Sequence, residues 1–190
     1  MTALLVPPAS VRSAEPAIPG ITEVFVLISI MLGYPDEELC ESREAIKQAL
    51  TVIPPSSAQR ECLEFATWWV AVDPARLRED YVATFDTRRR SALYVTYNAY
   101  RDTDQRGVAL YDMKQLYRSY GFRPTDEELP DYLPTVCQFA ALAPTDGGLE
   151  ALRLSRVGVH GIRQALIKQK SVYAHLLTAI EYIIEKGVKL

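Results

Sequence analysis

The side chains that could carry chemistry do not form a known catalytic or metal-binding pattern. The two histidines, His160 and His175, occur outside any H-x-x-x-H or H-E-x-x-H spacing, so the sequence predicts no metal site. The nucleophile motif G-x-S-x-G and the phosphate-binding loops G-x-x-x-x-G-K and G-x-G-x-x-G are missing as well. We therefore expect a protein that is not an enzyme and that holds no cofactor of its own.

The cysteines and the hydrophobic runs indicate the compartment. Cys40, Cys62 and Cys137 are odd in number, far apart and free of any C-x-x-C pattern, which predicts free thiols in a reducing environment. The apolar run over residues 24–32 is too short to cross a bilayer and has no basic segment before it, as a signal peptide would. We expect a cytoplasmic protein without stable membrane insertion.

Length and composition fit one globular domain. The chain has 190 residues, of which 48% are hydrophobic and 24% charged. The net charge of −3 leaves no basic surplus for nucleic acid, so no nucleic-acid partner is expected. Residues 1–20 contain four prolines and little periodicity, which predicts a flexible tail in front of a single helical domain over residues 21–190.

The residues that could bind a partner gather in the middle of the chain. Seven tyrosines lie within residues 81–120, and tyrosine offers a large contact area with a polar tip. Helical spacing alone would also place many of these rings in the core of a bundle. Asp86 precedes the basic run 88–90, the spacing of Asp102 and Arg106 suits a helical ion pair, and Asp131 follows a proline at a helix start. These polar residues either cap and link helices or line one rim of a shared groove.

The elements that must position these residues are helices. Apolar residues recur at helical spacing almost everywhere, and strand alternation is nearly absent. Asp36 and Asp73 are predicted helix caps, and Leu77, Tyr81 and Phe85 form one apolar stripe. Further signals predict a capping box over residues 125–128, a loop at residues 147–148, and a long helix weakened by two glycines at residues 158 and 161.

Several segments, in order and spacing, resemble the nitrate reductase assembly chaperones, the NarJ branch of the TorD/DmsD redox-enzyme maturation proteins. The resemblance runs from residue 24 to residue 144 and includes the early segment Leu-Gly-Tyr-Pro-Asp at residues 32–36. Its most specific part is Glu-Leu-Pro-Asp-Tyr-Leu-Pro at residues 128–134. The other matching segments are residues 81–86, 88–94, 102–107 and 116–121. The sequence departs from the branch where Tyr100-Arg101 replaces a usual His-Gly pair and where Gln138 replaces a usual Glu.

The resemblance implies a fold and a function. The fold would be the all-α, single-domain helical bundle of the TorD-like chaperones. The protein would bind the apo form of the nitrate reductase α subunit, partly through the N-terminal peptide of that subunit. It would assist insertion of the molybdenum cofactor before the subunit docks at the membrane, with proteins of cofactor biosynthesis as further partners. Two alternatives stay open: a chaperone for a dimethyl sulfoxide or trimethylamine N-oxide reductase, and a nucleotide-binding enzyme.

The matched segments also supply the predicted client-binding residues. An acidic helical protein with an aromatic groove suits a basic amphipathic helix, because carboxylates form charge-assisted hydrogen bonds with arginine. The predicted contacts lie in three of the matched segments and comprise Tyr81, Phe85, Asp86, Asp102, Arg106, Gly107, Glu128, Leu129, Pro130, Asp131 and Leu133.

Overall fold

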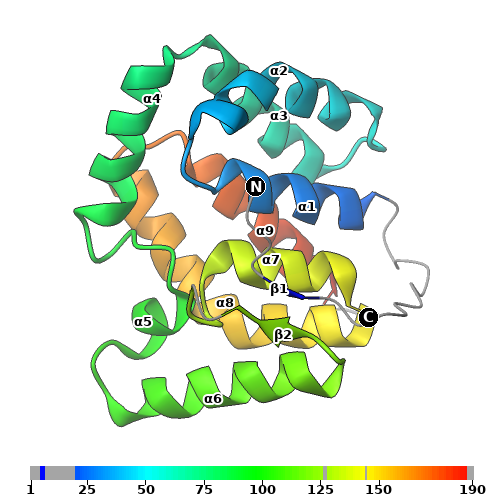
Figure 1. Cartoon of the computed structure of the whole chain (residues 1–190), viewed down its shortest axis with the longest axis vertical. Helices are drawn as coiled ribbons and strands as arrows, with labels where there is room; N and C mark the ends of the chain where they lie inside the picture. Colours follow the sequence, from blue (N-terminus) through cyan, green and yellow to red (C-terminus); the bar gives the residue numbers. More distant parts are fainter. Residues whose placement is uncertain (1–4, 7–19, 126–127, 144, 188–190) are drawn as a thin grey trace.

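The computed structural model describes residues 5–6, 20–125, 128–143 and 145–187, and within these ranges the fold is a helical bundle with one short two-stranded sheet (Figure 1). This confirms the predicted all-α class. The elements in chain order are β1 (Leu5–Val6), α1 (Ile21–Met31), α2 (Glu37–Val52), α3 (Ser57–Ala71), α4 (Pro74–Tyr81), the π-helical turn η1 (Val82–Asp86), α5 (Val95–Tyr100), α6 (Asp104–Ser119), β2 (Arg123–Pro124), α7 (Leu133–Leu142), α8 (Thr145–Lys168) and α9 (Ala174–Gly187).

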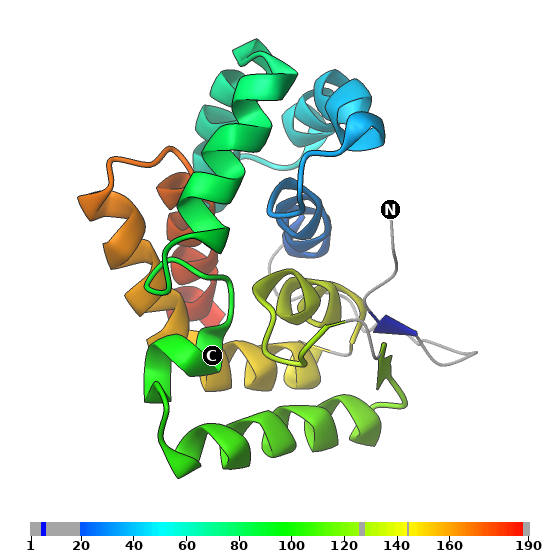
Figure 2. The same ribbon diagram turned by 60° about the vertical axis from the view of Figure 1, so that its left-hand side comes forward.

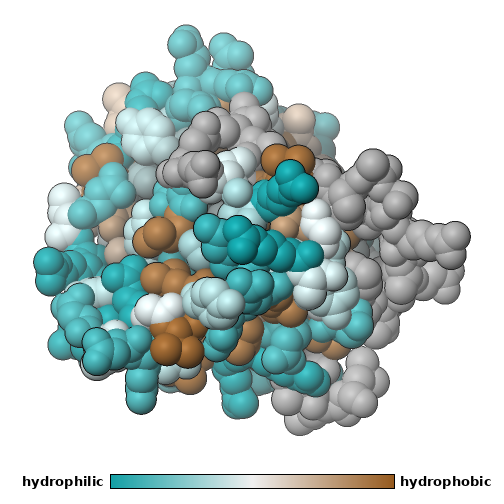
Figure 3. All heavy atoms as spheres, turned by 60° about the horizontal axis from the view of Figure 1, so that its bottom comes forward, coloured by the Kyte–Doolittle hydropathy of each residue, from teal (hydrophilic) through white to brown (hydrophobic). Residues whose placement is uncertain are grey.

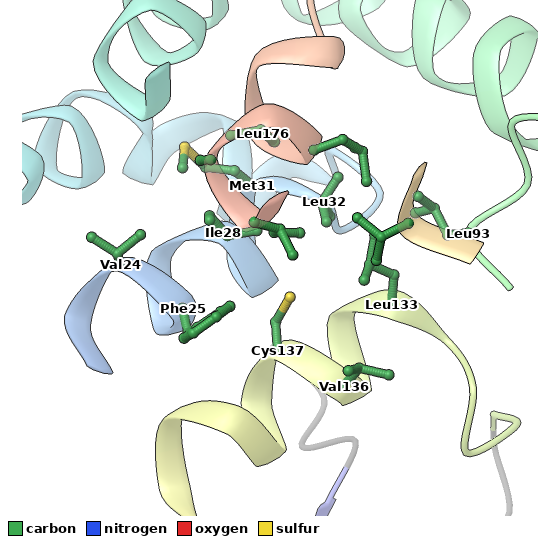
Figure 4. Close-up of a cluster of buried hydrophobic side chains, with 14 of the residues drawn as sticks. Val24, Phe25, Ile28, Met31, Leu32, Leu93, Leu133, Val136, Cys137 and Leu176 are labelled. Atoms are coloured by element: carbon green, nitrogen blue, oxygen red, sulfur yellow. The ribbon is translucent and has the colours of Figure 1, made fainter. Parts of the chain in front are cut away.

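The helices pack around a centre formed by α1, α7 and α9. In Figures 1 and 2, α2, α3 and α4 lie on one side of this centre, whereas α5, α6 and α8 lie on the other. Helix α1 packs on α7, α3 on α9, and α8 on α5, α7 and α9. Figure 4 shows how side chains of α1 and α7 face one another, joined by Leu176 from α9 and by Leu93 from the segment before α5. One continuous hydrophobic core therefore joins helices from both halves of the chain.

Helix starts follow the sequence signals closely. The Asp36 carboxylate accepts a hydrogen bond from the amide of Leu39 at 2.8 Å, and the Asp73 carboxylate accepts one from the amide of Ala75 at 2.9 Å. Both predicted caps are thereby confirmed, since each carboxylate satisfies an amide that has no partner within its own helix.

The apolar stripe after Asp73 is also confirmed, but its backbone differs from the prediction. Leu77, Tyr81 and Phe85 are all buried. Helix α4 gives way at Val82 to the π-helical turn η1, which ends at Asp86. Such turns insert an extra residue into a helix and occur often at functional sites.

The glycines of α8 have a different role from the one that the sequence suggested. Gly147 and Gly148, predicted to form a loop, lie inside the first turns of α8. A Cβ atom on Gly147 would come within 2.8 Å of the Tyr120 ring, and one on Gly148 within 2.9 Å of the Ala140 carbonyl oxygen. These glycines therefore bring α8 close to α6 and α7.

The outer face of the bundle near α6 is mainly polar. Turning the lower edge of Figure 1, where α6 lies, toward the viewer shows hydrophilic side chains with smaller hydrophobic areas between them (Figure 3). The inner side of α6 buries Met113 and Tyr117. Among the described helices, none combines the length and the hydropathy needed to cross a lipid bilayer.

The short strand β1 ties the N-terminal segment to the bundle. Leu5 and Val6 pair antiparallel with Pro124 and Arg123, and Leu5 is buried against the core. The flexibility predicted for residues 1–20 stays a prediction. All three cysteines are free thiols, with Cys62 and Cys137 buried and Cys40 half-buried.

Substitution of Gly158 tests the close approach of α8 to α5. A Cβ atom there would lie 2.0 Å from the Val95 carbonyl oxygen, whereas one on Gly161 would lie 3.5 Å from Asn98 Cβ, an ordinary contact. We expect Gly158→Ala to lower the free energy of unfolding by about 1–3 kcal/mol through overpacking. Gly161→Ala should leave it unchanged or raise it by up to about 1 kcal/mol, because alanine favours helix. Urea denaturation measures both, and equal effects would contradict this account.

Candidate functional site

A groove of about 540 Å³ lies between the C-terminal end of α1, one side of α2 and the start of α7. It brings together residues 32–36 and 128–134, two of the segments on which the family resemblance rests. The groove is lined by Ser29, Ile30, Gly33, Tyr34, Asp36, Glu38, Leu39, Ser42, Ile46, Glu128, Tyr132, Pro134 and Gln138.

The turn after α1 presents an aromatic ring at the groove. The amide of Gly33 donates to the Ile30 carbonyl at 3.0 Å, and the amide of Asp36 donates to the Tyr34 carbonyl at 2.8 Å. Tyr34 is 48% exposed and packs edge-on against Tyr81, with ring centroids 5.5 Å apart. A half-exposed ring on a rigid turn offers a ready contact to an apolar partner.

The groove is acidic. Asp36, Glu38 and Glu128 contribute three carboxylates, and its described lining contains no lysine, arginine or histidine. The apolar side chains Ile30 and Leu39 lie on the same surface. The groove can therefore accept cationic groups beside an apolar face.

Glu128 is fixed in place by a tyrosine from the segment before α5. The Tyr94 hydroxyl donates to Glu128 Oε1 at 2.7 Å, and the amide of Leu129 donates to the same oxygen at 3.1 Å. Burial, and then the hydrogen bond to this carboxylate, raise the pKa of the Tyr94 hydroxyl, so Tyr94 remains a donor at neutral pH. The predicted capping box includes residues 126–127, which lie outside the described residues.

Asp131 lies behind the groove, where it caps α5. Its carboxylate is fully buried, and Oδ2 accepts from the Thr96 amide at 3.1 Å and from the Thr96 hydroxyl at 2.5 Å. Its backbone carbonyl accepts from the amide of Val95 at 3.0 Å. The expectation that Asp131 caps the following helix is wrong, because Tyr132 precedes α7 and Asp131 instead satisfies an amide of a helix 35 residues earlier.

Burial sets the protonation behaviour of this carboxyl. It raises the pKa of Asp131 above its usual range, although the hydrogen bonds from Thr96 and the nearby Arg106 charge oppose the shift. Among the described residues, Oδ1 has no hydrogen-bond partner.

Arg106 supports the same cluster from α6. Its Nε donates to the Thr96 hydroxyl at 3.3 Å, and its guanidinium carbon lies 5.4 Å from the centre of the Tyr97 ring. The predicted ion pair with Asp102 is wrong: within the described residues Asp102 is exposed and Arg106 makes no salt bridge with it. Arg106 faces inward because a cation–π contact and a buried hydroxyl hold it there.

The remaining predicted site residues divide between core and surface. Tyr81 and Phe85 are buried, and the Tyr81 hydroxyl donates to the Leu32 carbonyl at 3.0 Å. Leu133 is buried in the core, and the Pro130 carbonyl accepts from the Tyr117 hydroxyl at 2.8 Å.

The predicted residues at the surface lie mostly away from the groove. Asp86, Asp102 and Gly107 are exposed and none of them lines it. Leu129 is 43% exposed and follows the groove residue Glu128 directly. The structure thus groups Glu128 with the groove and Asp131 and Arg106 behind it.

Sequence reasoning missed the half of the groove that comes from α1 and α2. Tyr34, Asp36 and Leu39 all line it. The resemblance at residues 32–36 was the signal that could have found them, because that segment matched the same family as residues 128–134. The described residues contain no group of three histidine, cysteine or acidic side chains able to hold a metal ion.

The family model described as nitrate reductase delta subunit matches residues 36–179, which include α2 and most of the helices that follow it. The chain belongs to the nitrate reductase delta subunit family of NarJ-type chaperones. The matched range holds both Asp36 and the 128–134 segment, so the family match covers the groove apart from its α1 side.

Relatives of known assignment agree with this family. A Bacillus subtilis protein assigned as nitrate reductase molybdenum cofactor assembly chaperone NarJ is 33% identical over 166 residues, which are 87% of this chain and 90% of the relative. The nitrate reductase molybdenum cofactor assembly chaperone NarJ of Escherichia coli is 26% identical over 131 residues, 67% of this chain and 55% of the relative.

A solved structure supports the fold. The crystal structure of an Archaeoglobus fulgidus protein assigned to redox enzyme maturation superposes with a TM-score of 0.64 at 20% identity, covering 92% of this chain and 99% of that one. The chain therefore shares the helical-bundle fold of that protein, in agreement with the predicted all-α bundle.

The buried Asp131 carboxyl predicts a pH effect on stability. Because its pKa is raised in the folded state, the folded protein holds this proton more tightly than the unfolded chain does. Its contribution to stability is full below the unfolded pKa of about 3.9 and is lost as the pH rises through the folded pKa. Relative to Asp131→Asn, the wild type should gain stability as the pH falls from about 7 to about 4.

Chemical denaturation at several pH values measures this difference. Asp112→Asn, at an exposed acidic position of α6, is the matched control and should show a much smaller pH dependence. A difference between wild type and Asp131→Asn that stays constant or moves the other way would show that the carboxyl is not a buried, desolvated group.

Proposed function

We propose that this chain is a client-specific chaperone that binds the apo form of the nitrate reductase α subunit. In this proposal it assists insertion of the molybdenum cofactor into the subunit before the subunit docks at the membrane. The observation that carries the proposal is the acidic, partly aromatic groove formed by two segments of a NarJ-type chain. The names of the Bacillus subtilis and Escherichia coli relatives support the same activity.

The proposed ligand of the groove is the N-terminal segment of the α subunit, bound as a basic amphipathic helix. Arginine side chains of that helix pair with the carboxylates of Asp36, Glu38 and Glu128 through charge-assisted hydrogen bonds, which are about twice as strong as neutral ones. The apolar face of the helix packs on Tyr34 and Leu39. Occupation of the groove would keep the client's N-terminus from docking elsewhere while the subunit is still open.

The predicted site residues take two kinds of role in this proposal. Glu128, which lines the groove, contacts the client directly, and so does the exposed Leu129 that follows it in the chain. Asp131 and Arg106 act indirectly, because they fix the backbone that presents Glu128. The proposed client-binding set also includes seven predicted residues that do not line the groove, namely Tyr81, Phe85, Asp86, Asp102, Gly107, Pro130 and Leu133.

The proposal places the chain in the cytoplasm, where an apo subunit would meet it. Three carboxylates in one groove favour fast capture of a basic segment, because complementary charge accelerates encounter. Proteins of cofactor biosynthesis are proposed to approach the client while the chaperone holds it. None of these steps requires the chain itself to bind metal or turn over a substrate.

Calorimetric titration of the full chain with the N-terminal peptide of the α subunit tests the proposal. We expect saturable binding that weakens with salt. Glu128→Gln should weaken it about 10- to 150-fold, since loss of a hydrogen bond to a charged group costs about 1.5–3 kcal/mol. Tyr34→Ala should also weaken it, through lost contact area.

Two controls keep this test specific. Asp112→Asn and Tyr111→Ala make the same kinds of change, a carboxylate to its amide and a tyrosine to alanine, at exposed positions of α6 that do not line the groove. Both should bind the peptide like the wild type. Absence of binding to the peptide and to the apo subunit would refute the proposal. Tighter binding of the corresponding peptide from a dimethyl sulfoxide or trimethylamine N-oxide reductase would reassign the client.

A further inference from the structure

A second pocket, of about 460 Å³, lies between α3, the junction of α4 with η1, and the turn that joins α8 to α9. Figures 1 and 2 both show that turn beside α4. The pocket shares no lining residue with the acidic groove. The net charge of its lining residues is also opposite in sign to that of the acidic groove, so it would bind a different kind of ligand.

The charge of this pocket is positive in a chain whose net charge is −3. Its lining holds three cations, Arg76, Arg88 and Lys170, and one carboxylate, Asp80. Arg76 Nη2 pairs with Asp80 Oδ1 at 2.9 Å. Arg88 and Lys170 make no ion pair with any described residue and are exposed, so two cationic side chains remain available for an anion.

Two hydroxyl groups and two aromatic rings also line the pocket. The hydroxyl groups of Thr84 and Ser171 face no hydrogen-bond partner among the described residues. Trp68 is half-buried and meets the buried Tyr173 ring edge-on at 5.9 Å. Two hydroxyls and two cations thus come from two separate segments of the chain, residues 84–88 and 170–171, and share one cavity.

The backbone is unusual on both sides of this cavity. Thr84 lies within the π-helical turn η1. Lys170 has φ of +55°, at the end of α8, where the amide of Ser171 donates to the Leu166 carbonyl and that of Lys170 to the Ile167 carbonyl, each at 3.0 Å. This helix-ending pattern usually carries glycine at the left-handed position, because a side chain there is strained. A lysine at that position suggests that its ammonium group has a use.

We propose that this pocket binds a small anion bearing a phosphate group. Arg88 and Lys170 supply the charge, and the hydroxyls of Thr84 and Ser171 donate to the remaining oxygens. A phosphate suits this set better than a carboxylate does, because its oxygens point in several directions and can accept donors from separate segments. The site is independent of the acidic groove.

Titration of the full chain with inorganic pyrophosphate at low ionic strength tests the site. We expect saturable binding that Arg88→Gln weakens at least tenfold. Lys170→Gly should weaken it to the same extent while raising the melting temperature, since glycine adopts positive φ without strain. Loss of binding with a gain in stability separates a role in binding from a role in folding.

The matched control is Arg156→Gln, which removes one positive charge at an exposed position of α8 outside the pocket. It should bind pyrophosphate like the wild type. Failure of the wild type to saturate, equal losses in Arg156→Gln, or full binding by Lys170→Gly would each overturn the proposal. Vesicles of phosphatidylglycerol, with phosphatidylcholine as reference, form a second arm: binding there that the same variants lose identifies a lipid headgroup as the source of the phosphate, and binding of pyrophosphate alone identifies a free anion.

Discussion

The buried carboxylate of Asp131 is the interaction on which the groove depends. Helix α5 has no capping side chain of its own, because its N-cap residue Tyr94 makes no such hydrogen bond. Asp131, 35 residues later in the chain, supplies that cap through its hydrogen bonds with Thr96. Since an unpaired carboxylate could not stay buried without a large desolvation cost, the segment before α7 and the start of α5 must remain together.

Close packing of α8 on α5, which Gly158 allows, also holds α5 in place. Gly158 lets the backbone of α8 touch the start of α5 at Val95, the residue directly before the amide that Asp131 caps. The position of α5 is thus fixed by close packing on one side and by a charged cap on the other. Together they hold the 128–134 segment at the depth where Glu128 and Tyr132 line the groove. The groove is acidic because the charged side chains that line it are the carboxylates of Asp36, Glu38 and Glu128.

The two surfaces proposed to bind partners differ in how they are built. The acidic groove joins the turn after α1 to the segment that leads into α7, and its aromatic ring and carboxylates suit a cationic helix. The basic pocket lies where a π-helical turn and a left-handed lysine meet, and both features place side chains that regular helices would direct elsewhere. An acidic chain that keeps cations together in one cavity can bind partners of opposite charge at separate places.

The sequence by itself determined the helices and the family. Helical periodicity, the caps at Asp36 and Asp73, and the ordered segments from residue 32 to residue 134 are local signals that neighbouring residues produce, and they gave the all-α class and the chaperone resemblance correctly. Where they failed, as for Gly147–Gly148 and the Asp102–Arg106 pair, packing against an earlier part of the bundle outweighed the local preference.

Only the tertiary structure decided which residues form the site. It placed Tyr34 and Asp36 across the groove from Glu128, although they are more than ninety residues apart in the chain. It also buried Asp131, whose neighbours in sequence suggest a surface cap, because its true partner is the amide of Thr96. Side chains of a suitable type can be recognised in a sequence. Whether they lie close together depends on packing between helices, which no local pattern encodes.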